Sequence, residues 1–80
     1  MKKVVNGIVY DSAAAQPLLT HRFSLHGIRA EETAYQMPEG YPFIVRRING
    51  QETALLPAST EDLRRWKQYR RRFPTQLWLG

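Results

Sequence analysis

The sequence predicts an α+β fold, in which a small antiparallel β-sheet of three to five short strands packs against an amphipathic, basic C-terminal helix. Two observations support this. Short β-branched and aromatic runs are separated by Asn-Gly and Pro-Glu-Gly turns, and one clear helical pattern stands near the end of the chain. With 80 residues the chain has room for one hydrophobic core, so we expect residues 1–80 to form a single domain.

The first twenty residues predict a β-element followed by a short helix. Lys3 to Tyr10 is β-branched and aromatic around Asn6-Gly7, a pair that supplies the positive φ angles of a tight hairpin. We therefore expect a short strand or a hairpin there. Asp11 or Ser12 can cap a helix, and three alanines with high helix propensity follow. A short, partly irregular N-terminal helix is expected within Ser12–Thr20, limited by Pro17.

The middle of the chain predicts antiparallel strands, because apolar and polar residues alternate there and turn-forming residues interrupt the alternation. Phe43 to Ile48 is the strongest strand pattern in the chain. The expected elements are a strand from Arg22, a bend at Gly27-Ile28, a strand Glu31–Met37, a turn Pro38–Pro42, a strand Phe43–Ile48, a turn at Asn49-Gly50 and a strand Gln51–Leu56.

A helix is expected from about Thr60 to Phe73, with Ser59 or Thr60 as its cap. Its apolar residues fall within a sector of about 120° and are expected to close the core; they are Leu63, Trp66, Tyr69 and Phe73. Arg70 lies on the edge of this stripe, so either its charged end extends to solvent or the apolar seam is narrower. After Pro74, the apolar segment Gln76–Leu79 is expected to dock on the core or to add an edge strand.

The same helix carries the charge of the protein. Leu63–Phe73 holds six of the twelve Lys and Arg residues and no acid, a charge of +6, whereas the rest has six cations and seven acids, a charge of −1. Such a face favours anionic partners, because local acids do not neutralise its positive potential. The predicted partner-binding residues are Arg64, Arg65, Lys67, Arg71 and Arg72. Arg46 and Arg47 are adjacent in a strand, so one of them should point outward and extend this surface.

The sequence offers little support for catalysis. It has no cysteine, no G-x-S-x-G motif and no phosphate-binding loop, so we expect no catalytic residue, no metal and no cofactor. His21 and His26 could pair with Asp11, Glu31 or Glu32, but a five-residue offset places them on opposite faces of a strand. Trp66 and Tyr69 could stack on bases, although their helical spacing favours a core position.

The composition also predicts where the protein works. The absence of cysteine fits a reducing compartment, and neither an apolar signal-peptide region nor a stretch of transmembrane length is present. We therefore expect a cytoplasmic protein with no membrane partner. It should be a monomer or a small homo-oligomer, and Tyr41, Phe43 or Trp78 would mark a dimer interface if exposed.

Two segments resemble a known group of proteins. Val5–Ala15, VNGIVYDSAAA, resembles the start of small phage- and plasmid-borne proteins whose N-terminus runs NGxxYDTxTA. Glu32–Trp66, ETAYQMPEGYPFIVRRINGQETALLPASTEDLRRW, is similar to their later part, in which an aromatic strand and a proline precede a capped helix with tryptophan. The resemblance implies an accessory protein of a mobile element, which would work in the cytoplasm of a bacterial host cell. This class includes anti-CRISPR inhibitors of host defence, and no catalytic residue transfers with the resemblance.

These observations together predict a non-enzymatic inhibitor of a host nucleic-acid-targeting complex, such as a CRISPR effector. Its basic helix face would dock on an acidic protein surface or on nucleic acid bound to the complex. The alternative is a small basic protein that binds nucleic acid directly, with an affinity that falls steeply with salt. A second alternative is a ribonuclease toxin, in which His21 or His26 would work with an arginine.

Overall fold

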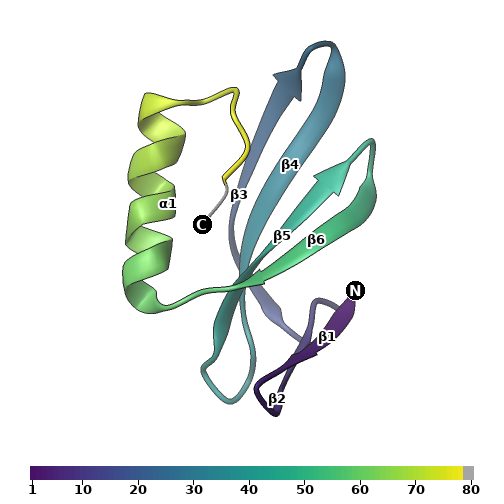
Figure 1. The fold of residues 1–80 in the computed structure, drawn as a ribbon, viewed down its shortest axis with the longest axis vertical. Coiled ribbons are helices and arrows are strands. Elements are labelled where there is room, and N and C mark those ends of the chain that lie inside the picture. The colour runs from purple at the N-terminus through teal and green to yellow at the C-terminus, as the bar shows by residue number, and fades with distance from the viewer. Residues whose placement is uncertain (79–80) are drawn as a thin grey trace.

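The computed structural model describes residues 1–78, which form six strands and one helix (Figure 1). In chain order they are β1 (Lys2–Val5), β2 (Ile8–Asp11), β3 (Gln16–Leu25), β4 (Ile28–Gln36), β5 (Pro42–Ile48), β6 (Gln51–Pro57) and α1 (Thr60–Arg72). β1 and β2 form a two-stranded sheet, and β3 to β6 form a four-stranded antiparallel sheet in sequence order. The α+β class is confirmed. The expected three to five strands are instead six, divided between two sheets.

Three of the strand pairs are joined by two-residue turns. Asn6-Gly7, His26-Gly27 and Asn49-Gly50 all have positive φ at both positions, near 51° and then 78–81°. These angles match the turns whose twist suits antiparallel neighbours, and Asn and Gly adopt them at low cost. The sequence prediction is therefore confirmed at both Asn-Gly pairs. At Gly27 the expected bend is a hairpin turn with His26 as its first residue.

The N-terminal helix expected within Ser12–Thr20 does not form. Residues 12–15 make a turn, in which the backbone N–H of Ala13 donates to Asp11 Oδ1 and that of Ala14 to the Asp11 carbonyl. β3 begins at Gln16 and pairs with β4 as far as Leu25. Pairing across the sheet overrides the helix propensity of three alanines, and Pro17 is tolerated because β3 is an edge strand.

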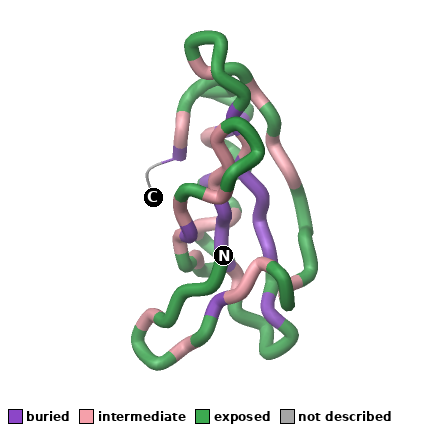
Figure 2. Tube along the Cα trace, turned by 90° about the vertical axis from the view of Figure 1, so that its right-hand side faces the viewer, coloured by how far each residue is buried: buried purple, intermediate pink, exposed green. Residues whose placement is uncertain are grey.

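The two faces of the four-stranded sheet carry separate cores. Figure 1 shows α1 and the β1–β2 hairpin at opposite sides of this sheet, and Figure 2 shows the buried residues along its middle. The core under α1 consists of Ala34, Ile44, Trp66 and Trp78. The core under the hairpin consists of Tyr10, Tyr35, Met37, Phe43, Val45 and Leu55. Because side chains alternate along a strand, β4 and β5 contribute to both cores.

α1 presents a narrower apolar seam than its sequence predicts. Ser59 caps the helix by accepting from the Asp62 N–H, and the Asp62 side chain accepts from the Ser59 N–H in return. This reciprocal capping box satisfies two donors that a helix start would otherwise leave unpaired. Trp66 is fully buried, whereas Phe73 is 37% exposed and lies just beyond the last helical residue. Phe73 therefore does not close the core as expected.

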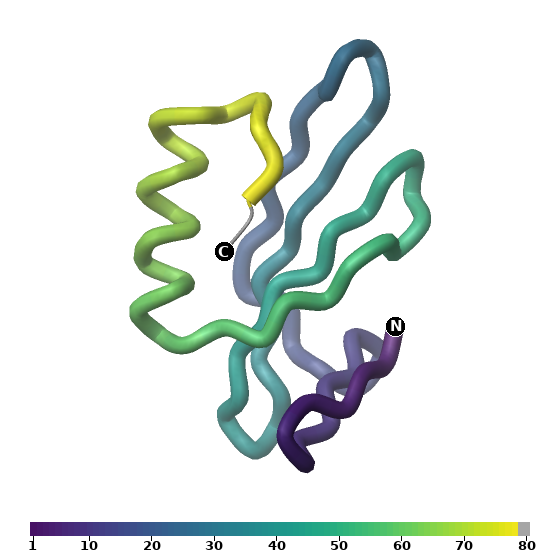
Figure 3. The backbone as a smooth tube through the Cα atoms, viewed as in Figure 1, coloured from purple at the N-terminus to yellow at the C-terminus, as the bar shows by residue number. Residues whose placement is uncertain are grey.

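The chain after α1 turns back between the helix and the sheet (Figure 3). Trp78 is buried and packs edge-on against Tyr69, with ring centroids 5.3 Å apart. Residues 76–78 thus dock on the core and add no strand, while Leu79 lies outside the described residues. Phe43 and Trp78 are both buried, so of the three aromatics considered for a dimer interface only Tyr41 is exposed.

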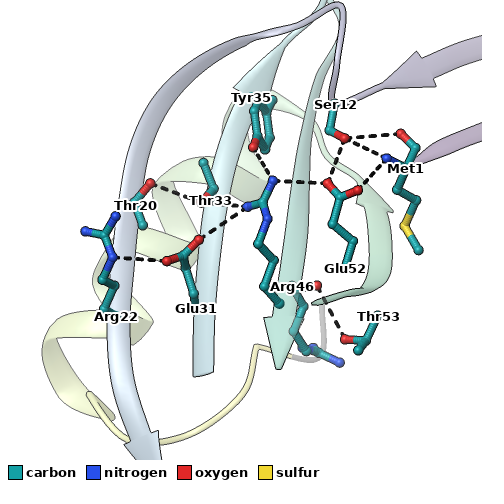
Figure 4. Close-up of polar contacts among 11 residues, drawn as sticks. Met1, Ser12, Thr20, Arg22, Glu31, Thr33, Tyr35, Arg46, Glu52 and Thr53 are labelled. Carbon is teal, nitrogen blue, oxygen red and sulfur yellow. Dashed lines mark hydrogen bonds and ion pairs between the residues drawn. The ribbon is translucent and has the colours of Figure 1, made fainter. Parts of the chain in front are cut away.

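A row of alternating charges crosses the sheet on the face opposite α1 (Figure 4). Arg22, Glu31, Arg47 and Glu52 are direct neighbours on β3, β4, β5 and β6. They are joined by ion pairs of 3.0, 3.4 and 3.0 Å, and Glu52 also binds the N-terminal amine and Ser12. The hydrogen bond from this amine is the main cause of the lowered pKa of Glu52, and the hydrogen bond from Ser12 is the next largest. The row thereby connects the N-terminal hairpin to the sheet.

Replacement of Trp66 tests the position of the helix core. Trp66→Ala should lower the free energy of unfolding by about 3–5 kcal/mol, because it removes the largest fully buried side chain. The control Phe73→Ala should cost roughly 1 kcal/mol or less, because that ring is partly exposed. Urea denaturation followed by circular dichroism measures both losses. Equal losses would show that Phe73 contributes to the core after all.

The depressed pKa of Glu52 predicts a pH dependence of stability. Its contribution is fully present above the unfolded-state pKa of about 4.5 and is lost as pH falls through the lower folded-state pKa. Glu52→Gln should therefore be less stable than the wild type at neutral pH, and the difference should shrink as the pH drops below about 4.5. Thermal unfolding between neutral and acid pH checks this. A pH-independent difference would contradict it.

Candidate docking surface

The five helix cations predicted for partner binding lie together on the outer side of α1. All five helix residues are exposed, namely Arg64, Arg65, Lys67, Arg71 and Arg72. The capped N-terminus holds the helix in place, and three arginines in the last turn interact favourably with the negative end of its dipole. These five cations therefore all lie on one capped helix.

These five cations divide into two groups. Arg64 and Arg65 both pair with Glu61, at 2.5 and 3.6 Å, and the hydrogen bond from Arg64 is the main cause of the lowered pKa of Glu61. Within residues 1–78, no carboxylate lies within ion-pair distance of Lys67, Arg71 or Arg72. We call these three residues the free cations. The uncompensated charge of α1 thus lies toward its C-terminal end.

A shallow groove separates this part of α1 from β3. Its volume is about 300 Å³, and its walls are Leu19, Thr20 and His21 from the strand with Trp66, Lys67, Arg70 and Arg71 from the helix. Two free cations, Lys67 and Arg71, therefore stand beside an edge strand of the sheet. Their spacing of four residues puts them on one side of the helix.

A buried carboxylate, that of Glu32, lies beneath the helix. It accepts hydrogen bonds from Trp66 Nε1 at 3.1 Å and from the Trp78 backbone N–H at 3.0 Å. Arg46 Nε lies 3.5 Å away, and Arg70 lies 3.2 Å away on its other oxygen. One carboxylate therefore faces two guanidinium groups. The cluster carries an excess of one positive charge.

Arg70 is the helix cation that belongs to the interior. It is only 6% exposed. Its guanidinium group lies within ion-pair distance of Glu32, but none of its nitrogens donates a well-formed hydrogen bond. The guanidinium lies instead over the rings of Tyr69 and Phe23, at 4.6 and 5.3 Å from their centroids. Burial lowers the pKa of Arg70, and the Glu32 charge opposes this. The charged end of Arg70 therefore does not extend to solvent, and the buried face of α1 includes this arginine beside the apolar residues.

Arg46 and Arg47 do not extend the basic surface. They face opposite sides of the sheet as predicted, but each is mostly covered and bound internally. Arg46 pairs with Glu32 and donates to the Trp78 carbonyl. Arg47 binds Glu31, Glu52 and the Tyr35 hydroxyl; burial lowers its pKa, but these contacts outweigh burial and raise it. The expectation that one of the two arginines points outward is therefore corrected.

The other candidate groups are placed apart. His21 bonds the Pro74 carbonyl through Nε2 and packs on Phe23, whereas His26 stands in the exposed turn between β3 and β4. Trp66 is fully buried and the hydroxyl of Tyr69 bonds Gln76 and Leu77, so neither ring is presented for base stacking. In residues 1–78 no three His, Cys, Asp or Glu side chains cluster as metal ligands would.

Sequence reasoning missed Glu32 as the partner of Arg46 and Arg70. The available signal was the match between two adjacent acids, Glu31-Glu32, and two adjacent arginines, Arg46-Arg47, in strands that pair. Opposite charges directly across an antiparallel pair are favourable, so this match would have suggested the register of β4 and β5.

The chain matches no protein-family model, and no curated protein or solved structure is significantly similar to it. As for membranes, the described part of the chain contains no helix that is both long and apolar enough to cross one.

Removal of the buried carboxylate tests its role. Glu32→Ala should lower the free energy of unfolding by about 3–5 kcal/mol, because it leaves two buried or half-buried guanidinium groups without their counter-charge. The neighbouring Glu31→Ala is the matched control and should cost at most about 1 kcal/mol, because its pairs are partly exposed. Urea denaturation of both variants measures the difference. Similar losses would contradict a special role for Glu32.

Proposed function

We propose that this chain is a non-enzymatic binding protein that inhibits a host nucleic-acid-targeting complex by docking on an acidic surface of that complex. The contact is made by the free cations Lys67, Arg71 and Arg72, with Arg64 and Arg65 at its margin. The observation that carries the proposal is the exposure of three cations on one helix, with no compensating carboxylate among residues 1–78. The nature of the partner rests on the resemblance to phage- and plasmid-borne proteins.

The chemistry of these side chains supports a carboxylate-bearing partner. Arginine binds a carboxylate through two parallel N–H groups, and such charge-assisted bonds are among the stronger hydrogen bonds. Three exposed like charges on one helix also repel each other, and an acidic partner relieves that repulsion. Exposed charges of this kind raise the rate of encounter and set the orientation more than they raise the affinity.

Direct nucleic-acid binding is supported less well. Single-strand binders combine cations with aromatic rings on which bases stack, and the rings of α1 are turned toward the core or engaged within the protein. Phosphate contacts alone would still give binding that depends strongly on salt. Titration with random duplex and single-stranded DNA at low and high salt therefore separates the two ideas. Binding at low salt that weakens steeply as the salt concentration rises would favour the nucleic-acid alternative, and no detectable binding at low salt would exclude it.

Charge reversal tests the proposed surface. The variant Lys67→Glu/Arg71→Glu/Arg72→Glu should bind a purified CRISPR effector complex at least about ten-fold more weakly than the wild type does. It should also fail to restore phage infection of an immune host. The matched control Lys2→Glu/Lys3→Glu/Arg29→Glu changes the net charge equally at exposed positions outside α1 and should behave as wild type. Calorimetry and plaque counts measure the two effects.

Two results would overturn this proposal. One is full inhibition by the helix variant while its circular dichroism shows an intact fold, because the partner would then use another surface. The other is an equal loss in both variants, because net charge rather than the helix face would then determine binding.

A further inference from the structure

β3 is an edge strand with an open outer side. No strand described in residues 1–78 pairs with that side, and six of its ten residues are exposed. The opposite edge, β6, is partly shielded by β1, from which Lys3 Nζ reaches the Leu55 carbonyl at 3.5 Å. An exposed edge presents unpaired backbone N–H and C=O groups, and these can accept a further strand from another chain.

The part of β3 that can accept a strand is its last seven residues, Leu19–Leu25. Pro17 lacks an N–H, and the register with β4 shifts between Pro17 and Leu19, so the first residues of β3 are irregular. From Leu19 to Leu25 the pairing with β4 is continuous. Proteins often protect such an edge with lysine, but β3 contains none.

The electrostatic surroundings of this edge favour an acidic strand. β3 itself has no acid, and its one cation, Arg22, is already paired with Glu31 of β4, so the attraction comes from the helix side of the edge. Lys67 and Arg71 stand across the groove from Leu19 and His21. Beneath them, the excess positive charge of the Glu32 cluster acts in the same direction. A strand beside Leu19–Leu25 would therefore lie in a positive potential.

We propose that β3 binds an extended acidic segment of a partner protein by strand addition along Leu19–Leu25. Carboxylates of that segment face Lys67 and Arg71 across the groove. This inference rests on the proposed function and specifies how the acidic partner is held: backbone hydrogen bonds supply affinity, and the free cations select for acid. A second copy of this chain fits poorly, because two β3 edges would bring Arg22 and two basic helices together without any acid on either strand.

Two synthetic peptides of equal length and charge test strand addition. One alternates Thr and Glu and can form a β-strand; the other alternates Pro and Glu and cannot donate the same backbone hydrogen bonds. The Thr-Glu peptide should bind at least about ten-fold more tightly, measured by calorimetry. It should also slow amide hydrogen exchange at alternate residues within Leu19–Leu25, but not within β6. The Lys67→Glu/Arg71→Glu variant should lose this binding, and Lys2→Glu/Lys3→Glu should retain it.

Each alternative result overturns the inference in a recognisable way. Equal binding of both peptides, lost in the helix variant, would disprove strand addition while leaving the basic surface of α1 as the docking site. Protection of β6 instead of β3 would place the added strand at the other edge. Absence of binding by either peptide would also overturn the inference, whereas the proposed function is judged independently by the effector assay. Self-association that protects β3 would show that a second copy is the occupant.

Discussion

The helix side of the fold depends on the hydrogen bonds and ion pairs made by the buried carboxylate of Glu32. It accepts from Trp66 on α1 and from the backbone of Trp78, and it faces Arg46 on β5 and Arg70 on α1. A carboxylate with no exposed surface is tolerated only when such partners surround it, because an unpaired buried charge costs several kcal/mol. The sheet, the helix and the returning C-terminal segment therefore have to assemble together around one side chain.

The same residue shows how the sheet register is specified. Glu31 and Glu32 are adjacent on β4 and lie directly opposite Arg47 and Arg46 on β5, so each face of the sheet receives one of these two ion pairs between β4 and β5. A slip of one residue would move every side chain of a strand to the other face, placing charge in a core and apolar groups in water. The two pairs differ in energy because their surroundings differ. Glu31 is about one-quarter exposed, whereas Glu32 is inaccessible to solvent.

Local signals in the sequence predicted the elements whose cause is local. Asn-Gly dipeptides identified two hairpin turns, Ser59 was one of two expected caps, and α1 spans nearly the predicted range. The prediction of an N-terminal helix was wrong. The alanines after Ser12 have a high helix propensity, but the residues that follow them pair with β4, and this pairing prevents a helix from continuing. Arg70 did not fit the helical pattern for a related reason. Its counter-charge, Glu32, is 38 positions earlier in the chain, and no periodicity along the helix can reveal it.

These internal pairings also change what the net charge of +5 means. Arg46 and Arg70 share Glu32, Arg47 binds Glu31 and Glu52, and Arg64 and Arg65 share Glu61. The basic segment of the helix therefore contains more cations than it leaves without a carboxylate partner. Those without one in residues 1–78 are Lys67, Arg71 and Arg72. That surface ends beside the open edge of β3. Under the proposed strand addition, backbone groups would supply affinity at this end of the helix and the free cations would supply selectivity, whereas the capped end carries mainly charges that Glu61 already balances.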